Sequence, residues 1–253
     1  MRNKTVNFTE GKILPSIVQY TIPLILSSLM QLFFSAADLA VLGNFDTSID
    51  SSAIGAVGAT GSIVALLVSS VIGLSGGTNV LLSRAVGAKN DDRAQDVVGT
   101  SIILSVVAGI VMMTVGYCSA RWFLNITACP ENCYSGALTY LYIYFAAAPA
   151  ILIYNFGSAI IRVSGDSHSP FVYILTSGVV NVVLNFVLCL MLEQKVAAVA
   201  IATLASNLLG MCLVIRHLLK IKTGACRVDI RRLSFSWKEL GNIFVLGLPT
   251  AFT

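Results

Sequence analysis

The chain has 253 residues, of which 56% are hydrophobic and only 11% are charged. Because soluble domains usually carry about 25% charged residues, this composition excludes an ordinary soluble protein and indicates a membrane protein. The formal net charge of +4 does not indicate nucleic-acid binding, because the basic residues lie in short clusters between apolar runs rather than in one patch.

Six apolar runs are long enough to cross a bilayer, which takes about 20 residues. They cover residues 14–43, 53–82, 97–123, 136–161, 170–192 and 196–219. Lipid offers the backbone no hydrogen-bond partners and the runs show no strand-like alternation, so all six are predicted to be helices. The first two are longer than needed, which favours tilt, a kink at Pro23 or extension into water. The predicted fold class is all-α, a polytopic membrane helix bundle.

The segments between the runs predict the orientation. Lys and Arg are enriched on the cytoplasmic side of membrane proteins. With the N-terminus inside, only Arg121 and Lys195 of the 16 basic residues fall on the outer side. Both ends of the six-helix unit are therefore predicted to lie in the cytoplasm, and the protein in the plasma membrane. The predicted outer loops carry the acidic residues Asp46, Asp50, Glu131 and Glu193.

The end of the chain resembles its beginning. Residues 237–249 align without gaps to residues 11–23. Four identities share one offset, namely Lys12/Lys238, Leu14/Leu240, Ile17/Ile243 and Pro23/Pro249. We therefore predict that a second six-helix repeat, parallel to the first and related to it by an axis along the membrane normal, begins here. The predicted parts are a cytoplasmic N-terminus (1–12), a six-helix transmembrane lobe (13–219), a basic cytoplasmic inter-lobe loop (220–239) and the truncated start of a seventh helix (240–253).

The first run holds a single carboxylate, Asp38. A charge at the centre of a membrane helix costs about 2.5–3.5 kcal/mol even on a lenient insertion scale, and such residues are usually functional. Gln31, Phe34, Ser35 and Asp38 follow the i, i+3, i+4, i+7 spacing of one helix face. This face could line a cavity in which Asp38 binds a proton or a cation. The alternative is that Asp38 lies near the outer end and reaches water. Pro23 gives the helix a place to bend.

Two later runs carry side chains that could serve Asp38. Asn181 and Asn185 are four residues apart, so both amides lie on one helix face, and the sixth run adds polar residues that include Thr203. One interpretation is hydrogen bonding between helices, worth about 0.6 kcal/mol per bond in membranes. With Asp38 as a fixed charge, the amide oxygens and the hydroxyl are also suitable ligands for a hard monovalent cation such as Na⁺.

Features that would indicate an enzyme are weak. Ser75 lies between glycines, but a serine protease needs a base in reach, and both histidines, His168 and His217, lie in or next to predicted cytoplasmic loops. No phosphate-binding loop is present.

Cys129 and Cys133 could form a loop disulfide or remain free thiols. The glycines of the second run, at 55, 58, 61, 73, 76 and 77, are predicted to allow close helix contacts. We predict no enzyme activity and no cofactor besides a coupling ion.

Several stretches together resemble the N-terminal lobe of the multidrug and toxic compound extrusion (MATE) family of cation-coupled efflux antiporters. They are TIPLIL (21–26), ADLAVLG (37–43), SRAVGAK (83–89), IRVSGD (161–166), NVVLN (181–185) and AVAIAT (198–203), in this order along nearly the whole chain. The resemblance implies one lobe of a two-lobed, pseudo-twofold transporter of twelve helices. Such a transporter exports organic, often cationic, drugs through a central cavity in exchange for Na⁺ or H⁺.

The resemblance also implies roles for particular residues. In members with a cation site in this lobe, the positions matching Pro23, Asp38, Asn181, Asn185 and Thr203 line that site, and bending of the first helix accompanies switching. Many such members have an acid at the position of Asn185. The amide here puts a carboxylate-pair proton mechanism in doubt. A Na⁺ site with one charge and a proton carried by Asp38 alone both stay open.

Two other functions were weighed against drug efflux. A lipid-linked oligosaccharide flippase of the same superfamily would need basic residues in its helix interiors, and this chain has essentially none there. A non-transporting membrane scaffold would not depend on Asp38. The expected partners are small-molecule drugs or organic cations, the lipid bilayer and a second six-helix lobe, with no nucleic acid.

Overall fold

The computed structural model describes residues 13–45, 52–221, 224–228 and 233–251. The predicted cytoplasmic N-terminus (1–12) and two acids of the first predicted outer loop, Asp46 and Asp50, lie outside the described residues.

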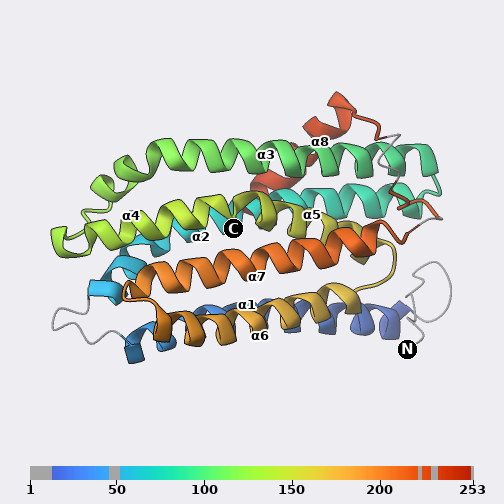
Figure 1. Cartoon of the computed structure of the whole chain (residues 1–253). Helices are drawn as coiled ribbons and strands as arrows, with labels where there is room; N and C mark the ends of the chain where they lie inside the picture. The colour runs from blue at the N-terminus through green and yellow to red at the C-terminus, as the bar shows by residue number, and fades with distance from the viewer. Residues whose placement is uncertain (1–12, 46–51, 222–223, 229–232, 252–253) are drawn as a thin grey trace.

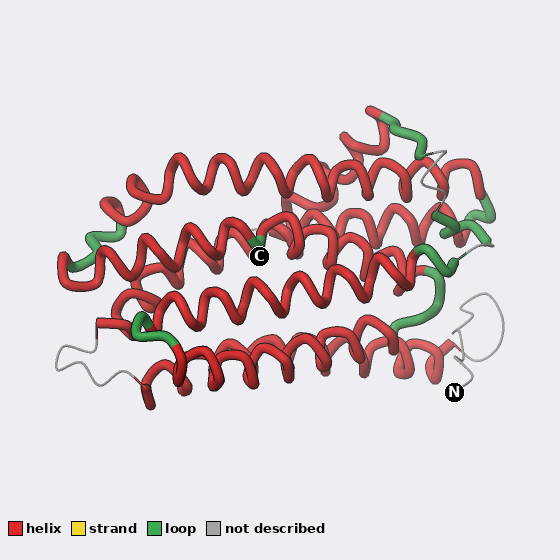
Figure 2. Tube along the Cα trace, in the orientation of Figure 1, coloured by secondary structure: helices red, strands yellow, loops and turns green. Residues whose placement is uncertain are grey.

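The described residues form helices joined by short loops, with no strand among them (Figures 1 and 2). The helices are α1 (Ile13–Phe45), α2 (Ser52–Gly87), α3 (Asp91–Ile126), α4 (Glu131–Ala146), α5 (Ala148–Val163), α6 (His168–Met191), α7 (Lys195–Leu218) and α8 (Trp237–Ala251). Five are long and apolar enough to cross a membrane, and the bent pair α4–α5 makes a sixth span. The predicted all-α, six-span bundle is confirmed.

The fourth span differs from its prediction. The run 136–161 was expected to be one helix, whereas α4 and α5 meet at Ala147 with a bend of 44°. Pro149 is the cause, because it has no N–H to donate and its ring clashes with the preceding turn of a continuous helix. The bend packs closely against Gly109 of α3. A Cβ added to Gly109 would lie only 2.6 Å from the Cα of Pro149. In contrast, α1 continues unbroken through Pro23.

The six spans lie side by side, and their connections gather at two ends of the bundle (Figure 1). The start of α1, the α2–α3 turn, the α5–α6 turn and the end of α7 lie at one end, on the right in the figure. These are the segments predicted to be cytoplasmic. Since α2 and α3 have 36 residues each, they are about 54 Å long and exceed the hydrocarbon core of about 30 Å.

Small residues bring the helices close together, as predicted, but only at some positions. A Cβ added to Gly77 of α2 would lie 2.5 Å from the carbonyl oxygen of Ile243, and one added to Gly55 would lie 2.7 Å from the Sγ of Cys133. At Gly58 and Gly61, no atom of the described structure lies within 4 Å of an added Cβ. The prediction of close contacts is wrong for these two glycines, because no described residue packs against their face of α2. All six cysteines are free thiols, so Cys129 and Cys133 form no disulfide.

The helices pack in a defined order. α6 packs between α1 and α7, α5 packs against α2, α3 and α7, and α8 packs against α2 and α3. The innermost side chains come largely from α5, where Phe156, Ile160 and Ile161 are fully buried. This arrangement places the polar residues of α1, α6 and α7 next to one another.

Candidate functional site

Asp38 and Asn185 meet between α1 and α6, although 147 residues separate them in the chain. The side-chain nitrogen of Asn185 donates a hydrogen bond of 2.5 Å to Oδ1 of Asp38. Asn185 is fully buried, and Asp38 is half-buried. The close approach depends on Gly178, because a Cβ at this position would lie 1.9 Å from the ring of Phe34. A glycine on α6 therefore lets α1 lie near enough for the two polar side chains to bond.

The polar contacts continue from α6 to α7. The same nitrogen of Asn185 donates to Oδ1 of Asn181 at 3.2 Å, one helical turn away. The nitrogen of Asn181 in turn lies 3.4 Å from both the Thr203 and the Ser206 hydroxyl oxygens and donates to them. One hydrogen-bond network thus crosses three helices, and we call it the polar network; its members are Asp38, Asn185, Asn181, Thr203 and Ser206.

The hydroxyl groups of the polar network present oxygen, not hydrogen, to the amides. Thr203 donates its hydroxyl hydrogen to the carbonyl oxygen of Val199 at 2.9 Å, and Ser206 donates to that of Thr203 at 2.9 Å. A hydroxyl has one hydrogen and two lone pairs. Because each hydrogen is used within α7, the lone pairs face Asn181.

One oxygen in the polar network is unsatisfied. Among the described residues, Oδ1 of Asn185 has no hydrogen-bond partner although it is buried. Leaving a buried acceptor unpaired costs about 1–3 kcal/mol, so this oxygen has a lone pair free to accept from a water or to bind a cation. Carboxylate, amide and hydroxyl oxygens are the donors that hard cations prefer. The donor set of Asp38, Asn181, Asn185 and Thr203 therefore fits a cation such as Na⁺.

The other predicted site residues lie on α1 outside the polar network. Gln31 and Ser35 are exposed on the surface of the lobe, and neither is part of the hydrogen bonding described above. Phe34 is half-buried, with its ring against Gly178. Pro23 lies fifteen residues before Asp38, and its carbonyl oxygen accepts a 2.7 Å hydrogen bond from the Ser27 hydroxyl. Phe34 thus positions α1, and the predicted cavity-lining role of Gln31 and Ser35 stays a prediction.

Two tyrosines near Asp38 were missed from the sequence. Tyr140 and Tyr144 of α4 are buried and stacked, with ring centroids 5.9 Å apart. Both lie close enough to Asp38 for its charge to act on them. Their spacing of four residues is a signal of a shared face. Tyr142 lies between them, however, and the sequence alone does not show which face of this aromatic run is buried.

Ser75, the residue considered for protease chemistry, bonds within its own helix. Its hydroxyl donates to the carbonyl oxygen of Ile72 at 3.0 Å. His217 lies near the end of α7 and bonds to Tyr173 instead, with 2.8 Å between Nδ1 and the phenol oxygen. Within the described residues, no contact joins Ser75 to a base.

Comparisons with known proteins agree on one family. The family model described as MatE matches residues 23–187. The "Probable multidrug resistance protein YpnP" of Bacillus subtilis is 28% identical over 250 residues, which cover 97% of this chain and 54% of that protein. The "Probable multidrug resistance protein YoeA" of the same organism is 30% identical over 186 residues, covering 72% of this chain and 40% of that protein. The chain spans about half the length of the curated relatives it matches.

Solved structures show the same fold. An outward-facing multidrug resistance MATE family transporter superposes with a TM-score of 0.89 at 23% identity, over 98% of this chain and 54% of that one. An inward-facing structure gives a TM-score of 0.80 at 22% identity, over 92% of this chain and 53% of that one. The helices described here thus have the fold of about half of such a transporter.

Proposed function

The chain belongs to the MatE family, and from this premise we propose that it is the N-terminal lobe of a secondary active multidrug efflux antiporter. The transporter exports organic, often cationic, compounds in exchange for Na⁺ or H⁺. The observation that carries the proposal is the polar network. In it, the Asp38 carboxylate of α1 accepts a hydrogen bond from the Asn185 amide of α6, which is linked through the Asn181 amide to the Thr203 hydroxyl of α7.

The structural setting of the proposal is a multi-pass membrane protein. We propose that it lies in the plasma membrane with a cytoplasmic N-terminus, and that a second six-helix lobe completes it. Curated relatives of about twice this length support the second lobe. The segment that precedes α8 is then the loop between the lobes, and α8, which begins at Trp237 and not at residue 240, starts the seventh helix.

The polar network suits a coupling ion because its members come from different helices. A bound Na⁺ would take oxygens from Asp38 on α1 and from Asn181, Asn185 and Thr203 on the other two helices. Asp38 lies about 22 Å along α1 from Pro23, at 1.5 Å per residue. A bend at Pro23 would therefore move Asp38 relative to the other ligands and change the ion affinity. A coupling ion can drive a conformational change only through such a difference in affinity between states.

A proton on Asp38 is the other form of the same mechanism. Asp38 is the only acid of the polar network, so ion and proton would compete for one carboxylate. Protonation would remove the charge that attracts a cation, while Asn185 could still donate to the carbonyl oxygen of the neutral acid. One site can thus serve either coupling ion, one at a time.

The decisive experiment measures transport by the complete protein in proteoliposomes. Efflux of a fluorescent drug cation such as ethidium is followed under a Na⁺ gradient alone and under a proton gradient alone. Asp38→Asn is expected to fold and insert but to lose gradient-driven export. Asp96→Asn, which removes a half-buried acid of α3 outside the polar network, is the matched control and should export normally. Unchanged export by Asp38→Asn would refute the assignment.

A further inference from the structure

A second group of polar side chains lies at the end of the bundle where α6 begins and α7 ends. It surrounds a pocket of about 380 Å³ lined by Ser169, Tyr173, Leu213, Arg216, His217 and Lys220, which we call the basic pocket. Tyr173 precedes Asn181 by eight residues on α6, about 12 Å along the helix. The basic pocket is therefore separate from the polar network.

Two walls of the basic pocket are joined by a hydrogen bond. The phenol oxygen of Tyr173 on α6 lies 2.8 Å from Nδ1 of His217 on α7. On its other side, Nε2 of His217 lies 3.9 Å from Oδ2 of Asp166. The Asp166 carboxylate is buried and accepts hydrogen bonds from the backbone and hydroxyl of Ser169, so it faces the α5–α6 turn and does not line the pocket. The walls are thus fixed before any ligand binds.

The charge of the basic pocket comes from Arg216 and Lys220. Arg216 lies in the last turn of α7 and Lys220 lies just beyond its end; both line the pocket, and both are exposed. Arg binds phosphate oxygens with two parallel hydrogen bonds, and Lys adds a point charge. The hydroxyl groups of Ser169 and Tyr173 add further polar contacts. This combination fits a phosphate group with a negative charge.

The surroundings indicate that the phosphate belongs to a lipid. Toward the middle of the membrane, the face of α7 that carries Arg216 continues with Cys212 and Leu208, both exposed and apolar. Within the described structure, α8 packs against α2 and α3, not against α6 or α7. Among the described residues, α8 therefore leaves this surface uncovered, and the position of Arg216 and Lys220 where α7 ends would place them near lipid headgroups. Basic pockets between membrane helices on the cytoplasmic side commonly bind anionic headgroups.

We propose that the basic pocket binds the phosphodiester headgroup of an anionic phospholipid, with its acyl chains along α7. Bound there, the lipid would bridge α6 and α7, the two helices that supply Asn181, Asn185 and Thr203 to the polar network. The proposal does not depend on drug export, because it rests on the pocket and on the membrane location of the bundle.

The test measures lipid binding to the complete purified protein. Native mass spectrometry follows titration with phosphatidylglycerol and, separately, with zwitterionic phosphatidylcholine. Each basic residue near a lipid surface strengthens anionic lipid binding about fivefold, so Arg216→Gln with Lys220→Gln should weaken phosphatidylglycerol binding about 30-fold. The control is Arg84→Gln with Lys89→Gln. It removes the same charge from exposed residues at the same end of the bundle and should leave binding unchanged.

Each other outcome overturns the proposal. Equal losses in both double variants would mean diffuse charge attraction, and no loss in either would mean that the pocket binds no lipid. Binding of inorganic phosphate as tight as that of phosphatidylglycerol would assign the pocket to a soluble anion. If the double variant does not fold, Lys220→Gln alone is sufficient, because Lys220 is exposed beyond the end of α7. This variant should lose about fivefold.

Discussion

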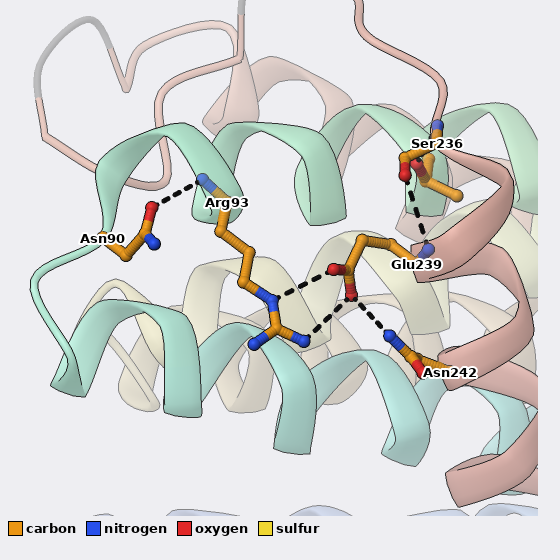
Figure 3. Close-up of polar contacts among 6 residues, drawn as sticks. Asn90, Arg93, Ser236, Glu239 and Asn242 are labelled. Carbon is orange, nitrogen blue, oxygen red and sulfur yellow. Dashed lines mark hydrogen bonds and ion pairs between the residues drawn. The ribbon is translucent and has the colours of Figure 1, made fainter.

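The guanidinium of Arg93, in the first turn of α3, donates two hydrogen bonds to the carboxylate of Glu239, in the first turn of α8 (Figure 3). Nε lies 3.0 Å from Oε1, and Nη2 lies 3.4 Å from Oε2. Asn242 adds a 3.1 Å hydrogen bond to Oε2. Only 5% of Glu239 is exposed, so its charge depends on these partners. The pair links the first lobe to the helix proposed to begin the second repeat.

Glu239→Gln is expected to weaken the docking of α8. The change keeps the shape of the side chain but removes the charge that Arg93 faces, and hydrogen bonds to charged groups contribute about 1.5–3 kcal/mol. We expect the thermal unfolding temperature of the purified protein to fall. Asp92→Asn removes an exposed acid next to Arg93 and should have almost no effect. Equal melting of the two variants would show that the pair does not stabilise the fold.

The pH dependence of this effect follows from the pKa of Glu239. Burial raises this pKa, but the hydrogen bonds from Arg93 and Asn242 and the charges of Arg93 and Lys238 outweigh it, so the pKa lies below its ordinary value. A lowered pKa stabilises the folded protein above the unfolded pKa, about 4.3, and this stability is lost as the pH falls through the folded value. The difference in melting temperature between the wild type and Glu239→Gln should be full at pH 7 and shrink below about pH 4. A constant difference would contradict an ionic contact.

Gly77→Ala should disturb the same interface from the side of α2. The added Cβ would lie 2.5 Å from the carbonyl oxygen of Ile243 and 3.0 Å from the backbone nitrogen of Gly247. Because these are backbone atoms, α8 itself must shift, and overpacking of this kind costs about 1–3 kcal/mol. Gly58→Ala is the control on the same helix, since no described atom lies within 4 Å of its added Cβ. It should be neutral or raise stability by up to about 1 kcal/mol. Similar melting curves for both variants would contradict the close packing.

Much of the fold was predictable because the bilayer leaves few choices. A run of about 20 apolar residues has to be a helix, so all six spans followed from composition and length. The break at Ala147 could not be predicted from composition and length. Apolar content indicates whether a segment is stable in lipid, but it does not indicate where the backbone bends. Pro149 was visible in the run, but Pro23 lies in a helix that continues unbroken. A proline alone therefore does not predict a break, and the neighbour that lies beside Pro149, Gly109 of α3, is set by the fold.

The polar network was predictable in part for a similar reason. A buried acid such as Asp38 is costly and needs partners, and the four-residue spacing of Asn181 and Asn185 puts two amides on one face. The burial of Tyr140 on α4 and, elsewhere in the fold, the pairing of Glu239 with Arg93 were not predictable. Both depend on which helix lies beside which, and a hydrophobic pattern without a polar stripe does not specify its neighbour.

Labelling of Cys129 tests the predicted orientation. Cys129 lies between α3 and α4, at the end of the bundle predicted to face outward, and is half-buried. A membrane-impermeant maleimide should label it in intact cells, with Cys129→Ser as the unlabelled control. Burial, with a smaller contribution from Cys133, raises the pKa of this thiol. Because the thiolate is the reactive form, labelling should be slow at pH 7 and faster at pH 8.5.

A cysteine introduced at the predicted cytoplasmic end of the bundle should not be labelled in intact cells. Ala88 is exposed in the turn between α2 and α3, which is predicted to be cytoplasmic. In a Cys129→Ser background, Ala88→Cys should be labelled only after the membrane is permeabilised. Labelling of Ala88→Cys in intact cells would reverse the proposed orientation.

Asn185→Asp tests whether the residue at this position determines how strongly transport depends on protons. The substitution places a second carboxylate at hydrogen-bond distance from Asp38, where Asn185 now donates. Two carboxylates so close cannot both be charged, so one of them should hold a proton. Transport by this variant without Na⁺ should therefore depend more steeply on proton concentration than transport by the wild type, by up to about tenfold per pH unit for one added proton. The measurement is drug export by the complete protein in Na⁺-free proteoliposomes at varied pH. Asn207→Asp is the matched control, because its amide donates to the backbone of Thr203 and does not reach Asp38. If Asn185→Asp and Asn207→Asp give the same pH profile as the wild type, Asn185 does not take part in coupling.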